Sequence, residues 1–360
     1  MLTKYNLNVL TNKGIKQSSE LYPGDKVYSY INSSTETLEI ADVIPIKYQM
    51  LYEILYNDGR KQIVGNDDLM YIGNNKSINI KYLFRYNTNE IYTNNIHIEP
   101  TRIKFSEIKN HLNPDPYLAG ILLFYGDYEN NFISLPLDIT RGIDYILSNS
   151  NYWIDCFDVK SDNRKFLKWK CEYNNKILWK DLFKHYNFYA KTKNSKDPLI
   201  PYEYQYTSIK NRIKFIRGIF DVGSNITLMP ASNSICNKDI RVLECIQKIL
   251  WSLGILSSIE YIPSYRVFIN QDEYEEYEND QYYVLYVNSS DLGYPGFYYE
   301  IDYIAKMIKN NVNTVFNLSK SSINIKKIKA IGPGWLDNIK FKNIRKAIYT
   351  SGNYLPRVSL

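Results

Sequence analysis

The residues that most often carry chemistry in proteins are few in this chain. Three histidines (His97, His111 and His185) lie far apart in the sequence, and the four cysteines show no Cys-x-x-Cys spacing. These spacings argue against a zinc site, a Ser-His-Asp triad and a disulfide framework. Hydrolytic chemistry would therefore need carboxylates and a divalent metal ion, with lysine in support.

A second candidate is a segment that interleaves cations with aromatic residues. It begins at residue 164 and extends to residue 180, and its cations are Arg164, Lys165, Lys168, Lys170, Lys176 and Lys180. This alternation is typical of a nucleic-acid-binding surface. It also fits a strand with a solvated lysine face and a buried aromatic face, so both interpretations stay open. For the lysines in residues 326–329 and 340–346, a solvated face is favoured over contact with DNA.

Charge and composition limit the class of protein. The chain has 360 residues, with 44 Lys and Arg against 38 Asp and Glu, and six of those acids lie within residues 272–280. Outside that segment the chain is more strongly basic, which suits a polyanionic partner, although charge alone does not identify one. An apolar fraction of 44% is typical of a globular protein of two or three domains.

No apolar run reaches the length of about 18 residues that a membrane-spanning helix needs. The first residues also lack the apolar core of a signal peptide. The sequence therefore predicts a soluble intracellular protein, without fixing its compartment. The chain is rich in Tyr, Lys, Asn and Ile, whose codons are AT-rich, and this hints at a virus, phage or organelle source.

The order of predicted elements indicates one module interrupted by another. Residues 1–105 show short strand patterns at 7–10, 26–30, 38–40, 51–56 and 62–64, separated by turn signals such as Asn-Asp-Gly at 57–59. Helical patterns follow at 118–125, 213–220 and 239–253, with strand patterns between and after them. The last 45 residues return to short strand patterns, which are interrupted at Gly-Pro-Gly (332–334) and at Ser-Gly (351–352). We expect a β module made of residues 1–105 and 311–360 and an insertion over 106–310, in two halves of about 106–200 and 201–310.

Two of the helical segments resemble the paired LAGLIDADG motifs of intein-associated homing endonucleases. The first match is Pro-Tyr-Leu-Ala-Gly-Ile-Leu-Leu-Phe-Tyr-Gly-Asp at residues 116–127, and the second is Phe-Ile-Arg-Gly-Ile-Phe-Asp-Val-Gly-Ser at residues 215–224. An Ile-Pro-x-x-Tyr segment that begins at Ile200 leads into the second motif, as in that family. Residues 9–14, 21–27 and 56–59 are similar to the amino-terminal half of a Hint domain, the splicing domain of inteins.

The resemblance implies an α+β fold: a pseudo-twofold αββαββα endonuclease-like domain inserted in an all-β Hint-like module. Gly120 and Gly218 would lie where the two motif helices meet, because small residues let helices approach closely. In the family, each motif helix ends in an acidic residue that holds a divalent metal ion at the DNA minor groove. A four-stranded saddle on each side lies in the major groove. The implied partner is double-stranded DNA, and the implied cofactor is Mg²⁺ if the protein is active.

The acidic positions of the family fall on Tyr125 and Gly223 in this chain. The acids closest to them, Asp127 and Asp221, are the candidate catalytic residues and metal ligands, and Lys196 is the candidate for the family's lysine. This displacement favours a DNA-binding protein with weak or no cleavage. The alternatives are an active Mg²⁺-dependent endonuclease that leaves staggered double-strand ends, and an intein relic recruited as a subunit of a larger viral or replication assembly.

Protein splicing is not expected. The first nucleophile of an intein would align near Met1, where no nucleophile exists, and the splicing histidine would align with Asp68. The chain closes with Tyr-Leu-Pro-Arg-Val-Ser-Leu, which lacks the His-Asn pair needed for asparagine cyclisation.

Overall fold

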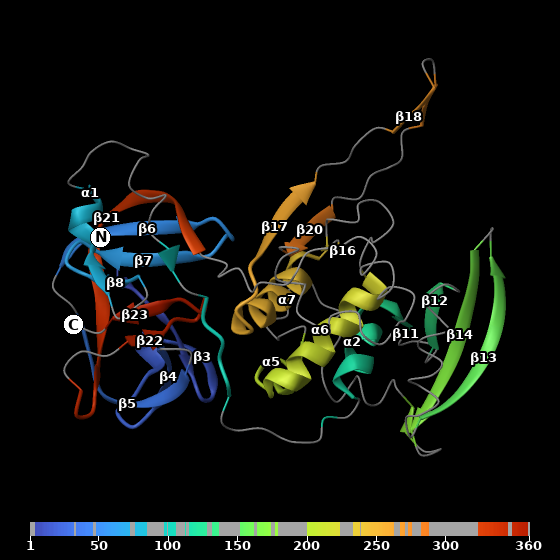
Figure 1. The fold of residues 1–360 in the computed structure, drawn as a ribbon, viewed down its shortest axis with the longest axis horizontal. Helices are drawn as coiled ribbons and strands as arrows, with labels where there is room; N and C mark the ends of the chain where they lie inside the picture. The colour runs from blue at the N-terminus through green and yellow to red at the C-terminus, as the bar shows by residue number, and fades with distance from the viewer. Residues whose placement is uncertain are drawn as a thin grey trace, which may run out of the picture. The chain divides into compact units, whose positions relative to one another are not determined.

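The computed structural model describes residues 4–31, 34–45, 48–72, 76–84, 97–98, 100–105, 112, 115–127, 132–136, 152–161, 164–173, 177–178, 200–223, 233–237, 239–262, 267–270, 273–275, 282–287, 323–344 and 348–358. For some of these residues, among them Asp127, Asp221 and all of 152–161 and 164–173, only the backbone is described. The chain divides into two compact units (Figure 1). Unit 1 comprises Met1–Glu107, Leu250–Ser258 and Leu318–Leu360, and unit 2 comprises Ile108–Ile249 and Ile259–Asn317.

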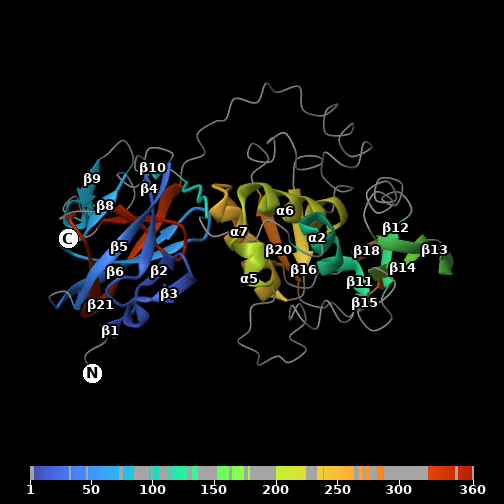
Figure 2. The same ribbon diagram turned by 90° about the horizontal axis from the view of Figure 1, so that it is seen from below.

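Unit 1 is built around a nine-stranded sheet that joins both ends of the chain. Its strands are β1 (Lys4–Tyr5), β2 (Asn8–Thr11), β3 (Gly14–Gln17), β4 (Lys26–Ile31), β5 (Ser34–Pro45), β6 (Gln49–Tyr56), β7 (Lys61–Gly65), β10 (His97–Ile98) and β21 (Ile323–Phe341). The order is β3-β2-β4-β5-β21-β6-β7, and β1 and β10 also pair with β21. The carboxy-terminal strand β21 therefore lies between two amino-terminal strands, as Figures 1 and 2 show.

Smaller elements complete unit 1. They are the 3₁₀ helix η1 (Ser18–Glu20), the paired strands β8 (Leu69–Tyr71) and β9 (Ser77–Asn79), the helix α1 (Ile80–Phe84), and the paired strands β22 (Ile348–Thr350) and β23 (Pro356–Val358). The predicted strands at 26–30, 51–56 and 62–64 are confirmed as parts of β4, β6 and β7.

The core of unit 1 mixes residues from distant parts of the sequence. One buried cluster packs Val9, Val27 and Ile40 against Leu336 and Ile339. Three consecutive residues are buried along β2 (residues 9–11) and along β4 (residues 27–29), so both faces of these strands are covered there.

A second buried cluster joins Ile54 and Met70 to Ile323 and to Leu256, which follows a helix from the middle of the chain. The division expected from the sequence leaves Leu250–Ser258 out of the β module. The structure assigns this segment to unit 1, because Leu256 is part of that unit's core.

Unit 2 is α+β. Its helices are α2 (Pro116–Tyr125), α5 (Tyr202–Gln205), α6 (Ile209–Gly223) and α7 (Ile240–Ser252), the last turn of which belongs to unit 1. One sheet has the order β11-β12-β14-β13, with β15 on β14; its strands are β11 (Gly126–Asp127), β12 (Phe132–Pro136), β13 (Tyr152–Ser161), β14 (Arg164–Tyr173) and β15 (Ile177–Leu178). Another has the order β16-β20-β17, with β16 (Asn233–Asn237), β17 (Ser257–Ile262) and β20 (Tyr282–Val287). Strands β18 (Val267–Asn270) and β19 (Glu273–Glu275) form a separate pair.

The helix expected over residues 239–253 is confirmed as α7. Its apolar positions Ile246, Ile249 and Leu250 are buried, as the helical spacing predicts. Gly254 ends the helix with a φ of 79°, and the amide of Ile255 donates back to the carbonyl of Leu250. Among the described helices, none is long and apolar enough to cross a membrane.

Candidate functional site

The two helices that contain Gly120 and Gly218 touch at their backbones. A Cβ atom placed on Gly120 would lie within 3.0 Å of the carbonyl oxygen of Phe215, and one placed on Gly218 would lie equally close to the carbonyl oxygen of Tyr117. Both separations are shorter than real Cβ atoms show, and the atoms they meet are backbone atoms that cannot swing away. Only glycine therefore permits α2 and α6 to approach this closely.

The contact is symmetric. The facing carbonyl lies three residues before each glycine, at Tyr117 and Phe215. The amide nitrogen of the residue after each glycine, Ile121 or Ile219, is also among the three nearest atoms. These nitrogens would lie 3.1 Å and 2.9 Å from the added Cβ atoms on the opposite glycines. Each position on α2 thus corresponds to the position 98 residues later on α6. A repeat of that kind is what a pseudo-twofold axis between the helices requires.

Polar contacts fix the first turns of both helices. Asp115 Oδ1 accepts a hydrogen bond from the amide of Tyr117 at 3.0 Å and so caps α2, while Asp115 Oδ2 lies 3.2 Å from Lys214 Nζ on α6. The fully buried Arg212 donates from Nε to the carbonyl of Thr207 at 3.1 Å. Buried apolar residues surround the contact, among them Ala119, Ile216 and Phe220.

The candidate acids occupy different backbone environments. Helix α2 ends at Tyr125, so Asp127 lies beyond it in β11, where its register partner is Phe132. Asp221 lies inside α6, which ends at Gly223.

The 98-residue correspondence between the helices matches Tyr125 with Gly223 and Asp221 with Leu123, while position 225, which corresponds to Asp127, lies outside the described residues. Asp127 and Asp221 are therefore not equivalent positions under this correspondence. Their side chains also lie outside the described part of the structure.

The donor set does not fit a symmetric pair of metal ions at the helix ends. Equivalent positions would need a carboxylate on each helix, and the chain has Tyr125 and Gly223 there. Among the described residues, no group of three His, Cys, Asp or Glu side chains could hold a metal ion. Lys196, the candidate catalytic lysine, lies outside the described residues.

Four of the candidate DNA-binding cations lie on β14. Arg164, Lys168 and Lys170 occupy alternate positions of the strand, and Lys165 occupies an intervening one. Strand β14 is an interior strand, because at Lys168 its register partners are Phe157 on β13 and Ser134 on β12. Lys176 and Lys180 lie outside the described residues.

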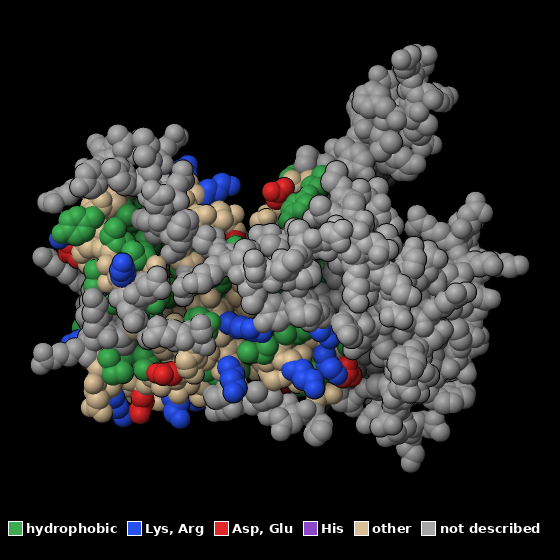
Figure 3. Space-filling view, in the orientation of Figure 1, with side chains coloured by type: hydrophobic (Ala, Val, Ile, Leu, Met, Phe, Trp, Pro, Cys, Tyr) green, Lys and Arg blue, Asp and Glu red, His purple; other side chains and the backbone are tan. Residues whose placement is uncertain are grey.

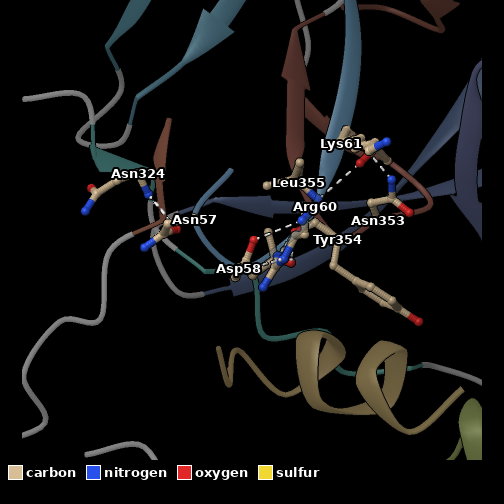
Figure 4. A network of polar contacts seen from close by, with 10 residues as sticks. Asn57, Asp58, Arg60, Lys61, Asn324, Asn353, Tyr354 and Leu355 are labelled. Atoms are coloured by element: carbon tan, nitrogen blue, oxygen red, sulfur yellow. Dashed lines mark hydrogen bonds and ion pairs between the residues drawn. The ribbon is translucent and has the colours of Figure 1, made fainter. Parts of the chain in front are cut away.

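The sequence pattern does not indicate a special role for Arg60, which is fully buried in unit 1. Its side chain is fully buried, its Nε lies 2.8 Å from Asp58 Oδ2, and its Nη1 donates to the carbonyl of Tyr354 at 3.1 Å (Figure 4). The guanidinium carbon lies 4.9 Å from the ring centroid of Trp251. Burial lowers the pKa of Arg60, and the charge of Asp58 opposes that shift. The neighbouring acid Asp58 is the local feature that could have indicated a buried ion pair, but the sequence pattern assigns Asp58 to a turn.

Asp68, the residue aligned with the splicing histidine, belongs to a buried ion pair. Its Oδ2 accepts a hydrogen bond from the amide of Gly65 at 2.9 Å and lies 3.3 Å from Arg357 Nη2. Arg357 also donates from Nη1 to the carbonyl of Ile63 at 2.8 Å. Burial raises the pKa of Asp68, while the charge of Arg357 and the bond from Gly65 lower it, and the net direction is upward.

No protein-family model and no curated protein matches the chain. Among solved structures, it is similar to the homing endonuclease I-DmoI. A variant of I-DmoI in complex with its target DNA, nicked in the coding strand and with Mn, gives a TM-score of 0.31 at 16% identity over 55% of this chain and 97% of that chain. I-DmoI in complex with DNA and Mn gives a TM-score of 0.31 at 16% identity, over 54% of this chain and 95% of that chain. Mesophilic variants of I-DmoI give a TM-score of 0.31 at 16% identity, over 56% of this chain and 97% of that chain. TM-scores at this level do not establish a common fold.

Proposed function

We propose that the chain is a double-stranded DNA-binding protein of the intein-derived LAGLIDADG lineage, which does not splice and cleaves DNA weakly or not at all. The observation that carries this function is the contact between α2 and α6. Two helices 98 residues apart meet through equivalent glycines, and a mostly antiparallel sheet follows each of them. Such a pair is a suitable frame for two sheets that flank a duplex.

DNA binding would use the cations of β14 and of the strands beside it. Lysine and arginine bind phosphates without reading sequence, and side chains that reach base edges supply specificity. Figure 3 shows lysine and arginine side chains on the described surface of both units. The affinity is expected to fall steeply as salt concentration rises, because each phosphate contact releases counterions.

Weak or absent cleavage follows from the inequivalent acids. Asp221 lies inside α6, two residues before its end at Gly223, whereas Asp127 lies two residues beyond the end of α2 at Tyr125. Two-metal hydrolysis holds its ions about 4 Å apart and needs carboxylates from both sides. The two acids of this chain therefore do not supply matching carboxylates for a two-metal site.

The residues of unit 1, taken as a Hint-like module, explain why the chain would not splice. In such a module, the position of Asp68 would hold a histidine that assists acyl transfer. In this chain the residue at that position is Asp68, which has no imidazole to accept a proton. Its Oδ2 lies 3.3 Å from Arg357 Nη2 in a buried ion pair.

A binding and cutting assay tests this function on the full chain. Fluorescence anisotropy with a mixed-sequence duplex should detect salt-dependent binding, and a supercoiled plasmid library with Mg²⁺ or Mn²⁺ should remain uncut. The informative variant is Asp221→Asn, and Glu244→Gln, exposed on α7, is its matched control. If metal-dependent cutting is lost in Asp221→Asn and kept in Glu244→Gln, the chain is an active Mg²⁺-dependent homing endonuclease instead. A chain that binds no duplex has neither function.

A further inference from the structure

The exposed part of β21 carries three closely spaced lysines. Its register against β6 shifts between Ile325, which pairs with Tyr56, and Lys327, which pairs with Leu55. Lys326 is therefore an extra residue in a β-bulge, and bulges redirect the side chains around them. In a regular strand, neighbouring side chains face opposite sides, whereas here Lys326 and Lys327 are both exposed, as is Lys329.

The acids among the described residues form no ion pair with these three lysines. The acid in register with Lys329 is Glu53, which lies 3.9 Å from Lys61 on β7. Within the part of the chain that the structure describes, no ion pair includes Lys326, Lys327 or Lys329.

Other lysines of unit 1 differ in this respect, since Lys16 is paired with Asp25 and Lys342 with Glu39. The surface formed by Lys61, Lys326, Lys327 and Lys329, here called the lysine ribbon, is thus a positive strip with one acid beside it.

We propose that the lysine ribbon binds the phosphate backbone of duplex DNA, so that unit 1 contributes to DNA affinity together with unit 2. This inference rests on the proposed DNA-binding function of the chain. Residues 326–329 span about 10 Å of strand, at about 3.4 Å per residue. One DNA strand presents a negative charge about every 3.4 Å of helix axis, so this span faces about three phosphates. Among the described residues, no exposed large apolar side chain lies within residues 326–329 or their register partners on β6, which favours DNA over a protein partner.

The test compares the salt dependence of DNA binding between two triple variants of the full chain. One carries Lys326→Gln, Lys327→Gln and Lys329→Gln. The control carries Lys26→Gln, Lys104→Gln and Lys340→Gln, three exposed lysines elsewhere in unit 1. Anisotropy titrations of a fixed duplex between about 50 and 200 mM salt give the slope of log K against log [salt]. The magnitude of this slope decreases by about 0.9 for each phosphate that the variant no longer binds.

The ribbon variant should lose up to about 2.7 units of slope and bind more weakly at low salt, while the control keeps most of its slope. Both variants should retain the wild-type unfolding midpoint, because all six side chains are exposed. If the wild-type chain binds DNA and the ribbon variant keeps the full slope, the inference is wrong and the proposed function stands. Equal losses of slope in both variants would also overturn the inference, since they would show that exposed lysines anywhere on unit 1 contribute equally. A wild-type chain that binds no duplex overturns both.

Discussion

Single buried residues of unit 1 bring together parts of the chain that are distant in sequence. The carbonyl of Tyr354 accepts hydrogen bonds from Arg60 Nη1 and, at 2.6 Å, from Thr101 Oγ1. Tyr354 has a φ of 56°, which is uncommon for a bulky aromatic residue. Two donors on one carbonyl hold this residue in a conformation that its side chain disfavours.

Replacing Arg60 should destabilise unit 1 strongly. Arg60→Met leaves Asp58, which is 4% exposed, as an uncompensated buried charge, and breaking such a pair costs about 3–5 kcal/mol. Urea unfolding followed by tryptophan fluorescence would measure the loss. The double variant Arg60→Met with Asp58→Asn should recover part of it, and the exposed control Lys61→Met should change stability by less than about 0.5 kcal/mol. Equal losses in Arg60→Met and Lys61→Met would contradict this role.

At the scale of helices, the contact between α2 and α6 is sensitive to a single methyl group. Gly218→Ala places a Cβ against the carbonyl of Tyr117, and both belong to helix backbones. Alanine favours helix by about 1 kcal/mol, but overpacking costs about 1–3 kcal/mol or more, so we expect a net loss of stability.

Differential scanning calorimetry on the full chain would measure this loss. We expect Gly218→Ala to lower the temperature at which unit 2 unfolds. Lys210→Ala, on the exposed side of the same helix, is the control and should leave that transition unchanged. An increase in melting temperature for Gly218→Ala would mean that the two backbones do not touch.

The first turn of α7 should make stability depend on pH. Asp239 Oδ1 accepts from the amide of Arg241 at 3.0 Å, and Asp239 Oδ2 pairs with Arg241 Nη2 at 2.6 Å. The side-chain hydrogen bond from Arg241 is the largest cause that lowers the pKa of Asp239 below 3.8, and burial opposes it. The unfolded chain then binds the proton first as pH falls. The stabilisation is present above pH 3.8 and is lost as pH drops through the lower folded value.

Asp239→Asn tests this dependence, because asparagine keeps the cap and removes the charge. Both side chains are more than a third exposed, so the variant should be less stable by about 0.2–1 kcal/mol at pH 6. The difference should shrink below pH 3.8, as seen in urea midpoints by circular dichroism. A difference that stays constant with pH would exclude the ion pair as its source.

Secondary structure is predictable where the pattern is local. The helical spacing and Gly254 predict α7 nearly to the residue. The carboxy-terminal pattern predicts short strands broken at Gly332 and Gly334, whereas β21 runs through both glycines as one strand. The bulge between Ala330 and Gly332, where Gly332 has a φ of 106°, absorbs the irregularity without ending the strand.

The candidate site is only partly predictable, for a geometric reason. A motif identifies which residues sit at a helix contact, because close approach requires glycine at Gly120 and Gly218. The motif does not determine where the side chain of an acid points when that acid lies two residues away from the family's acidic position. The end of α2 at Tyr125, which puts Asp127 in a strand, depends on pairing with Phe132, and no local pattern specifies that pairing.

At the scale of the whole molecule, distant segments join to form each core. Arg60, Thr101, Trp251 and Tyr354 come from four parts of the chain, and none has a neighbour pattern that marks it as buried. Burial of this kind is a property of the assembled unit. It therefore could not be predicted from any window of the sequence.

The place of β21 between β5 and β6 also bears on how the protein is made. A ribosome releases β5 and β6 roughly 270 residues before β21, which at about 5–20 residues per second is a delay on the order of tens of seconds. During that interval the nascent amino-terminal strands have an open slot with unpaired edges, which attracts chaperones and promotes aggregation. Slow synthesis of the middle of the message would lengthen this exposure, and supplying the late strand in trans would shorten it.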